Sequence, residues 1–401
     1  MGRDSPRRER TGRVGALRDT GVTSKFVHHR SDLARHFADA LLGRSPFTHA
    51  AGLFLAGPRR TGKSTFLRED LVPMLEAEGV ACIYVDLWAD RAADPARLIA
   101  DALARALRDH AGPARRLADR VGLTRLRLHG VEIDLDRIGA PDGVTLGDAL
   151  AHLHRLTGGP VALIVDEAQH ALSSPAGIDA MFALKAARDA LNQGRSGDAP
   201  ALILIFTGSH RDKLVGLLAN GRQPFYGASV TDMPLLGEDY VRAYVDWLNQ
   251  RLAPANRFDP EAAQTAFELL GHRPELLERA LRDIALGPEG ATDLPRRVVA
   301  GAEDLREKLW KAYDSDFGEL TAPQRAVLAE IIAQGAEFQP FVQSTLAAVG
   351  RRLGRDVAKG TVQSALNELK EKGLVWQSGR GQYALEDQGM IPWLAQRGAA
   401  P

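Results

Sequence analysis

The stretch GPRRTGKST, residues 57–65, decides the fold of this chain. Gly57, four further residues and then Gly-Lys-Ser match the pattern G-x-x-x-x-G-K-[ST]. Glycines in such a loop let the backbone N–H groups face inward, where they form a concave site for an anion. The apolar run GLFLA (52–56) is typical of a buried strand, and a helix is expected from Lys63 to about Glu78. The positive N-terminal end of that helix would also face the anion, so the sequence predicts a phosphate-binding loop.

The polar residues of this loop have separate expected roles. Lys63 would reach the outer phosphates of a nucleotide, and the hydroxyl of Ser64 would bind Mg²⁺. Thr65 follows where the backbone passes near the inner phosphate. Arg59 and Arg60 could add charge toward the phosphates or toward a neighbouring subunit, or could pair with acids on the rim. The predicted nucleotide-binding residues are Gly57, Pro58, Arg59, Arg60, Thr61, Gly62, Lys63, Ser64 and Thr65.

Polar residues also end two other apolar runs. After VALIV, Asp166 could hold Mg²⁺ directly or through water, and Glu167 could orient and deprotonate an attacking water. After ALILIF, either Thr207 or Ser209 could touch both that water and the γ-phosphate, and the sequence does not distinguish them. The acids and the loop thus predict a site for a nucleoside triphosphate with its metal ion.

Near-continuous apolar runs separated by helices indicate a parallel sheet covered on both faces. Ligands of such sheets bind at the carboxyl ends of the strands, where the loop and the acid pair both fall. The run GVEIDLD (130–136) is expected to be an extra edge strand, and the surrounding stretch 110–148 receives no predicted function. We therefore expect an α/β P-loop NTPase fold with a five-stranded parallel core sheet. Its predicted strands are 52–56, 81–88, 161–167, 201–209 and 227–236.

The pattern becomes helical after Asp239, and the last part of the chain differs again. Three helical segments followed by VWQSGRGQYAL predict a winged helix, in which a helix from about Lys359 to Leu369 would enter the major groove of DNA. The predicted organisation is a basic disordered tail (1–23), an ATPase core (24–236), a helical lid (237–315) and a winged-helix domain (316–401). The tail, with six arginines and three acids in its first 20 residues, could instead be a phosphate-contacting arm.

Composition limits the possible partners. The formal net charge is zero, so no whole-molecule field attracts nucleic acid or membrane, and such a partner would need a local patch. No apolar run approaches the roughly 18 residues of a membrane-spanning helix, so no membrane partner is expected. The single cysteine, Cys82, lies in an apolar run and is expected to be a small core residue in a reducing cytoplasm.

The loop GPRRTGKST and the strand ends LIVDEAQ and FTGSHRDKL together resemble those of AAA+ ATPases. With FVHHRSDLARHF, QPFYGAS and GHRPELLERAL, the chain is more narrowly similar to the archaeal-type ATPase group, near the STAND and origin-initiator ATPases. The resemblance covers about residues 25–315. It implies ATP and Mg²⁺ as ligands, a helical lid and a site completed between subunits of a homo-oligomer. It also implies a first sensor at Ser209 or Thr207 and a nucleotide-sensing position in the lid near Arg273.

One motif departs from the family pattern. Relatives often carry an arginine after P-[LF]-[YF]-G, whereas Ala228 follows PFYG here. Arg222 or Arg211 could replace that arginine, which would complete the site of a neighbouring subunit. An arginine supplied in this way accelerates related phosphoryl transfers about 10³–10⁵-fold, so its loss favours slow or partner-stimulated ATP hydrolysis.

The sequence is compatible with three functions. The first is an ATP-hydrolysing switch or remodeller acting on DNA through the winged helix, with a basic cluster at Arg351, Arg352, Arg355 and Lys359. Residues 320–390, however, hold eight Lys/Arg and seven Asp/Glu, a balance that weakens the DNA hypothesis. The alternatives are a STAND-like signalling ATPase whose winged helix contacts proteins, and a nucleotide-stabilised scaffold without turnover.

Overall fold

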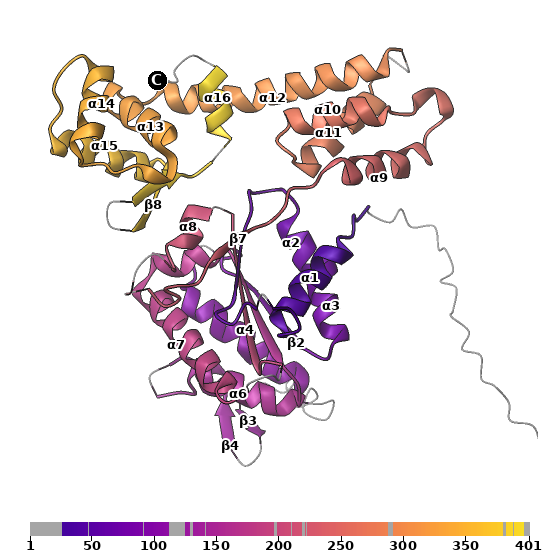
Figure 1. The fold of residues 1–401 in the computed structure, drawn as a ribbon, viewed down its shortest axis with the longest axis vertical. Coiled ribbons are helices and arrows are strands. Elements are labelled where there is room, and N and C mark those ends of the chain that lie inside the picture. The colour runs from indigo at the N-terminus through magenta and orange to yellow at the C-terminus, as the bar shows by residue number, and fades with distance from the viewer. Residues whose placement is uncertain are drawn as a thin grey trace, which may run out of the picture.

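The structure is a computed structural model. It describes residues 26–46, 48–90, 92–111, 125–128, 131–140, 142–195, 199–209, 211–218, 221, 223–287, 292–379, 382–387 and 389–396. They form a central α/β part, a helical part and a C-terminal part of helices with one hairpin (Figure 1). The tail predicted at residues 1–23 lies outside the described residues.

A five-stranded parallel sheet forms the centre of the α/β part, as the sequence predicts. The strand order is β2-β5-β6-β1-β7. The three inner strands are buried along their whole lengths, because helices cover both faces of the sheet. Pairing sets Asp86 beside Asp166 and Leu55 beside Thr207, so the polar strand ends meet at one edge. The strands are β1 (Leu53–Ala56), β2 (Ala81–Asp86), β5 (Val161–Asp166), β6 (Leu202–Gly208) and β7 (Val230–Asp232).

Alternate residues of the strands belong to two hydrophobic cores, one on each face of the sheet. Leu53 and Leu55 of β1 pack with the first helix and with the helix that follows the loop. Phe54 packs in the opposite core, where its ring stacks 4.9 Å from that of Phe206. This double burial explains why the strands read as continuous apolar runs. The covering helices are α1 (Ser31–Leu41), α4 (Pro95–His110), α6 (Leu146–Thr157) and α7 (Pro175–Asn192), with a short α8 (Arg211–Val215) after β6.

The helix expected after the loop forms, but it is not a regular α-helix throughout. It comprises α2 (Lys63–Phe66), a π-helical segment (Leu67–Leu71) and α3 (Val72–Ala77). Pro73 accounts for the wider turn, since proline lacks an N–H and its ring would clash with the carbonyl four residues earlier. The helix still begins at Lys63, so its N-terminus faces the loop.

The expected extra edge strand at 130–136 is wrong. β4 (Val131–Asp134) instead pairs antiparallel with β3 (Arg125–Leu128) in a separate two-stranded sheet. The sequences RLRL and VEID alternate polar and apolar residues, which suits a hairpin with one polar face. The inner strands β1, β5 and β6 of the central sheet are buried on both faces, so this hairpin could not replace one of them.

Among the described residues, four α-helices form the helical part, and Figure 1 shows this part above α1 and α2. Its core includes Val241, Phe267 and Leu277. Phe26, from the segment before α1, packs against this core, with its ring 5.2 Å from that of Tyr244. The helices are α9 (Glu238–Asn249), α10 (Pro260–Leu269), α11 (Pro274–Ala285) and α12 (Leu294–Gly318).

The C-terminal part contains the predicted order of three helices followed by a hairpin. The long helix α12 leads into it, and its Tyr313 and Phe317 rings lie 5.9 and 5.4 Å from that of Trp393. The domain boundary predicted at 315/316 therefore falls inside α12, which continues unbroken to Gly318. The elements are α13 (Ala322–Gln334), α14 (Gln343–Leu353), α15 (Lys359–Glu371), β8 (Val375–Gly379), β9 (Gln382–Leu385) and α16 (Met390–Gln396).

Candidate nucleotide-binding site

The phosphate-binding loop connects β1 to α2, and its backbone conformation favours glycine at one position while close packing favours it at another. Gly62 has φ 91°, a left-handed conformation that glycine adopts without strain. A Cβ atom on Gly57 would lie 3.3 Å from the Cβ of Met233, which is tighter than ordinary contact. Thr61 closes the turn by donating a 2.7 Å hydrogen bond from its hydroxyl to the carbonyl of Pro58. The loop therefore opens toward the N-terminal end of α2, as an anion site requires.

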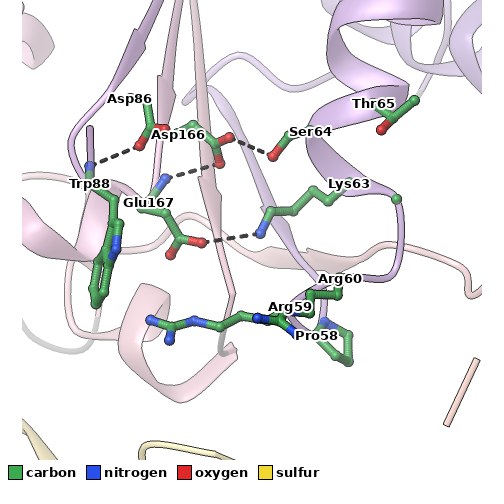
Figure 2. Close-up of a pocket in the computed structure, with 11 residues that line it drawn as sticks. Pro58, Arg59, Arg60, Lys63, Ser64, Thr65, Asp86, Trp88, Asp166 and Glu167 are labelled. Carbon is green, nitrogen blue, oxygen red and sulfur yellow. Dashed lines mark hydrogen bonds and ion pairs between the residues drawn. The ribbon is translucent and has the colours of Figure 1, made fainter. Parts of the chain in front are cut away.

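Asp166 is the centre of the hydrogen-bond network at the strand ends. Its carboxylate accepts a 2.8 Å hydrogen bond from the Ser64 hydroxyl (Figure 2). It accepts two more from the hydroxyls of Tyr84 and Thr207. Burial raises the pKa of Asp166, but the charge of Lys63 and these three donors outweigh burial, so the pKa lies below its usual range. The carboxylate is thus held in its charged form beside the Ser64 hydroxyl.

Glu167 faces Lys63 from the end of β5. Its Oε1 lies 3.7 Å from Nζ of Lys63, and its backbone is in the left-handed region at φ 53°. Gln169 and the Ser209 hydroxyl, the latter at 2.9 Å, donate to Oε2. Burial raises the pKa of Glu167, but the charge of Lys63 and the two hydrogen-bond donors lower it by more, so the pKa lies below its usual value. Glu167 is therefore held in its charged form beside Lys63.

The geometry separates the two candidate sensors. Thr207 is fully buried, and its hydroxyl is engaged with Asp166 beneath the site. Ser209 contacts Glu167 through both its backbone N–H and its hydroxyl. Of the two residues, Ser209 is the one joined to the acid that faces Lys63.

The two adjacent loop arginines have different partners. The guanidinium of Arg59 lies 4.5 Å from the ring centroid of Trp88, and its Nε lies 3.4 Å from the Ser209 hydroxyl. Arg60, at φ 65°, instead pairs with Glu275 of α11 at 2.6 Å. One arginine thus extends along the candidate site and the other reaches the helical part.

Two cavities meet at the loop. The first has a volume of about 360 Å³ and contains the loop, both acids, Asp86 and Trp88 (Figure 2). The second, of about 530 Å³, shares the loop residues Arg60, Gly62 and Ser64 with the first. Its other wall carries charged residues, such as Glu69 and Glu278, and an aromatic group from the segment before α1 and from α9. The residues of this aromatic group are Phe26, Tyr240, Tyr244 and Trp247.

Sequence reasoning missed these aromatic residues as well as Tyr84 and Trp88. Tyr240, Tyr244 and Trp247 follow one another at helical spacing, and that spacing also suits a buried core, so it does not distinguish the two uses. Tyr84 could have been found from strand order, because β2 lies beside β5 in the sheet. Strand order, however, is a property of the folded chain.

The structure does not bring Arg273, Arg211 and the acids of the site together. Arg273 lines a separate cavity between the helical and C-terminal parts, and its guanidinium lies 3.7 Å from the Asp387 carboxylate. Arg211 pairs with Asp232 at 2.6 Å. Arg222 lies outside the described residues. The role expected for Arg273 as a nucleotide sensor therefore stays a prediction.

A known protein family has a sequence model that matches the part of the chain containing this site. Residues 47–214 match the family model described as an AAA domain. This segment contains the loop, Asp166, Glu167 and Ser209. Residues 47–214 are therefore similar to an AAA domain, and the matched segment holds the P-loop that the motifs predict. No curated protein sequence matches the chain.

Solved structures share the fold over most of the chain. The Walker-type ATPase PABY2304 of Pyrococcus abyssi is 18% identical, with a TM-score of 0.54, and the match covers 92% of this chain and 96% of that one. The ORC2 protein of Aeropyrum pernix in its ADP form is 14% identical, with a TM-score of 0.51 and 94% of each chain covered. These similarities confirm the P-loop NTPase fold. Among the described helices, none combines the length and apolar character that crossing a membrane requires.

Proposed function

We propose that this protein binds and hydrolyses Mg·ATP and acts as a nucleotide-dependent switch or remodeller on DNA. The observation that supports this most directly is the convergence of four side chains at one sheet edge. Ser64 bonds to Asp166 at 2.8 Å, and Lys63 lies 3.7 Å from Glu167. A lysine, a hydroxyl and two carboxylates beside a phosphate loop are the parts that ATP hydrolysis needs.

The donors fit Mg²⁺, because this ion prefers oxygen ligands and is usually held by one or two carboxylates together with substrate phosphates. Ser64 and Asp166 would hold it, with the Asp166 carboxylate already ionised. Bound Mg²⁺ would neutralise the charge that develops on the phosphates. Lys63 would exchange its contact with Glu167 for the outer phosphates of ATP. The loop Gly57 to Thr65 would surround the remaining phosphate oxygens, and its backbone N–H groups from Arg59 onward would donate to them, since Pro58 has no N–H and that of Gly57 bonds to Gly208.

Glu167 would then orient the attacking water and accept its proton. The water oxygen bonds to the γ-phosphorus, the bond to the bridging oxygen of ADP breaks, and phosphate leaves. Ser209 would keep Glu167 in position through its 2.9 Å hydrogen bond. Thr207 would act indirectly, because its hydroxyl donates to Asp166 and orients that carboxylate.

The aromatic cavity is suited to the base of the nucleotide. It adjoins the phosphate loop, and rings such as those of Tyr244 and Trp247 can stack on a purine. The A. pernix ORC2 structure is described as an ADP form, which supports adenine as the base. Binding between α9 and the segment before α1 would couple the nucleotide to the helical part, which therefore acts as a lid.

The C-terminal part supplies the proposed DNA contact. The outward side of α15 carries the exposed side chains of Ser364 and Asn367, and Gln363 donates to Asn367 at 2.9 Å. Amide side chains of this kind can pair with base edges in the major groove. The N-terminus of α15 has no side-chain cap, so N–H groups of its first turn could receive a backbone phosphate.

The basic cluster beside α15 is smaller than the sequence suggests. Arg352 pairs at 2.7 Å with Glu330, a carboxylate whose side chain is 9% exposed. Its role is therefore structural, because the pair neutralises a largely buried charge. Arg351, Arg355 and Lys359 are exposed and remain the proposed phosphate contacts.

The DNA proposal is tested by fluorescence anisotropy with duplex DNA at several salt concentrations. The double variant Arg355→Ala/Lys359→Ala should weaken binding and lower the salt slope by about two, one for each lost phosphate contact. The matched control Arg279→Ala removes an exposed charge from α11 and should leave binding unchanged. Absence of binding at low salt with ATP, with ADP and without nucleotide would overturn the proposal.

One observation favours the alternative, a signalling ATPase whose winged helix contacts proteins. The hairpin strand β8 lies against α8 of the α/β part, so the proposed wing is partly covered (Figure 1). A homo-oligomer formed with ATP is proposed on the family resemblance. If ATP changes the oligomeric state in a sizing column while DNA binding is absent, the signalling function is the one supported.

A further inference from the structure

Arg59 occupies a position that the proposed chemistry leaves unexplained. It lies inside the phosphate loop, lines the same cavity as Lys63 and Glu167, and rests on the face of Trp88 at 4.5 Å. An arginine on an aromatic face is held in a defined orientation while its N–H groups stay available. The geometry therefore suggests a positioned cation and not a mobile surface charge.

We propose that Arg59 binds the γ-phosphate within its own chain, and that Glu386 of the C-terminal part competes with this phosphate for the Arg59 guanidinium. The inference rests on the proposed ATPase function and deepens it. Arg59 would distinguish ATP from ADP, and its contact with Glu386 would let the C-terminal part respond to the nucleotide.

The first argument is the chain of contacts around the cavity. Nε of Arg59 is 3.4 Å from the hydroxyl of Ser209, and that hydroxyl bonds to Glu167 at 2.9 Å. Glu167 in turn lies 3.7 Å from Nζ of Lys63. Lys63 thus approaches Glu167 directly, and Arg59 approaches it through Ser209. A terminal phosphate held by Lys63 in this cavity would come within reach of the Arg59 guanidinium.

The second argument is that the other arginines considered are committed elsewhere. Arg60 pairs with Glu275 at 2.6 Å, and Arg211 pairs with Asp232 at 2.6 Å. Arg273 lies against Asp387. Among the described residues lining the cavity, the arginine side chain that joins the Ser209–Glu167 network is that of Arg59.

The third argument is the acidic pair that follows β9. Oε1 of Glu386 lies 3.4 Å from Nη2 of Arg59. In the next residue, Asp387, Oδ1 lies 3.7 Å from Nη2 of Arg273, and Oδ2 accepts a 2.6 Å hydrogen bond from the Tyr313 hydroxyl. One short segment therefore contacts the phosphate loop and the lid together. Because Glu386 and a γ-phosphate would compete for Arg59, ATP binding should weaken the contact of the C-terminal part. By linkage, breaking that contact should strengthen ATP binding by the same factor.

The test measures binding and turnover of the full-length protein. Calorimetry with Mg·AMP-PNP and with Mg·ADP gives the two affinities separately. Arg59→Ala should weaken AMP-PNP binding about 10- to 100-fold, as expected for a lost hydrogen bond to a charged group, with little change for ADP. It should lower kcat in the same variant, and Arg59→Lys should recover part of both effects because it keeps the charge.

Glu386→Gln tests the restraint separately. It should strengthen AMP-PNP binding about two- to five-fold, the range expected for a partly exposed ion pair, without changing ADP binding. The control Glu319→Gln removes an exposed carboxylate at the end of α12 and should change neither affinity.

The outcomes separate this inference from the proposed function. If the parent protein binds neither nucleotide, both are wrong. If the parent binds and hydrolyses ATP but Arg59→Ala leaves the ratio of the two affinities unchanged, or lowers both affinities equally, only the inference about Arg59 is wrong. If Arg59→Ala behaves as expected and Glu386→Gln matches the control, the restraint by the C-terminal part is refuted.

Discussion

Lys63 and Glu167 face each other across the candidate site, with Nζ of the lysine 3.7 Å from Oε1 of the acid. The Lys63 side chain is only 6% exposed and that of Glu167 is 16% exposed. Each charge therefore compensates the other where water is largely excluded. The same lysine is also the charge that most strongly lowers the pKa of Asp166, so it balances both carboxylates.

Lys63→Ala should abolish detectable Mg·ATP binding in calorimetry, because it removes the cation that would meet the outer phosphates. It should also lower the free energy of unfolding in urea, since Asp166 and Glu167 would remain as adjacent buried carboxylates without their cation. Lys311→Ala removes an exposed lysine from α12 and serves as the control. Undiminished ATP binding by Lys63→Ala would contradict the assignment of the phosphate lysine.

Glu167→Gln should retain Mg·ATP binding and lose hydrolysis. The amide keeps the shape of the side chain but cannot accept the proton of water, and such proton transfer contributes about 10²–10⁴-fold to rate. Phosphate release measured under single-turnover conditions checks the chemical step directly. Hydrolysis at the parent rate would show that another group is the base, and measurable hydrolysis by the parent would exclude a scaffold without turnover.

Stability should depend on pH through the two acids. Both folded-state pKa values lie below the ordinary values, so each carboxylate stabilises the fold at pH values above its ordinary pKa. That contribution is lost as the pH falls through the depressed folded-state pKa. In urea unfolding, the free energy of unfolding should therefore fall as the pH is lowered below the ordinary pKa values of the two acids, 3.8 for Asp166 and 4.5 for Glu167. Glu167→Gln should fall less steeply over the same window, and an identical slope would contradict the depressed pKa of Glu167.

Trp247→Ala should weaken ATP binding by about 1–2 kcal/mol, because a base loses a stacking partner in the aromatic cavity. Binding of inorganic triphosphate, which has no base, should stay unchanged in the same variant. Trp310→Ala, in α12 and outside this cavity, is the matched control. Equal losses for ATP and triphosphate would indicate damage to the phosphate loop instead of a lost base contact.

The sequence predicted which side chains meet at the strand ends better than it predicted the bounds and pairing of the elements. GPRRTGKST and the acids after VALIV could be identified because a phosphate loop needs fixed residue types at fixed local spacing. The strand at 130–136 was assigned to the wrong sheet, because the alternation that identifies a strand does not name its partner. Likewise, the helix after the loop was correctly predicted, while its π-helical segment was not.

By itself, the sequence determined the parallel core, the phosphate loop and the two acids, because local backbone geometry and burial on both faces restrict those residues directly. Only the tertiary structure decided how Arg59 and Arg60 divide between the cavity and the lid, which of Thr207 and Ser209 meets Glu167, and that Glu386 reaches the loop. The physical reason is that side-chain partners distant in sequence are chosen by packing. Arg59 and Glu386 are separated by 327 positions, and no local pattern relates them.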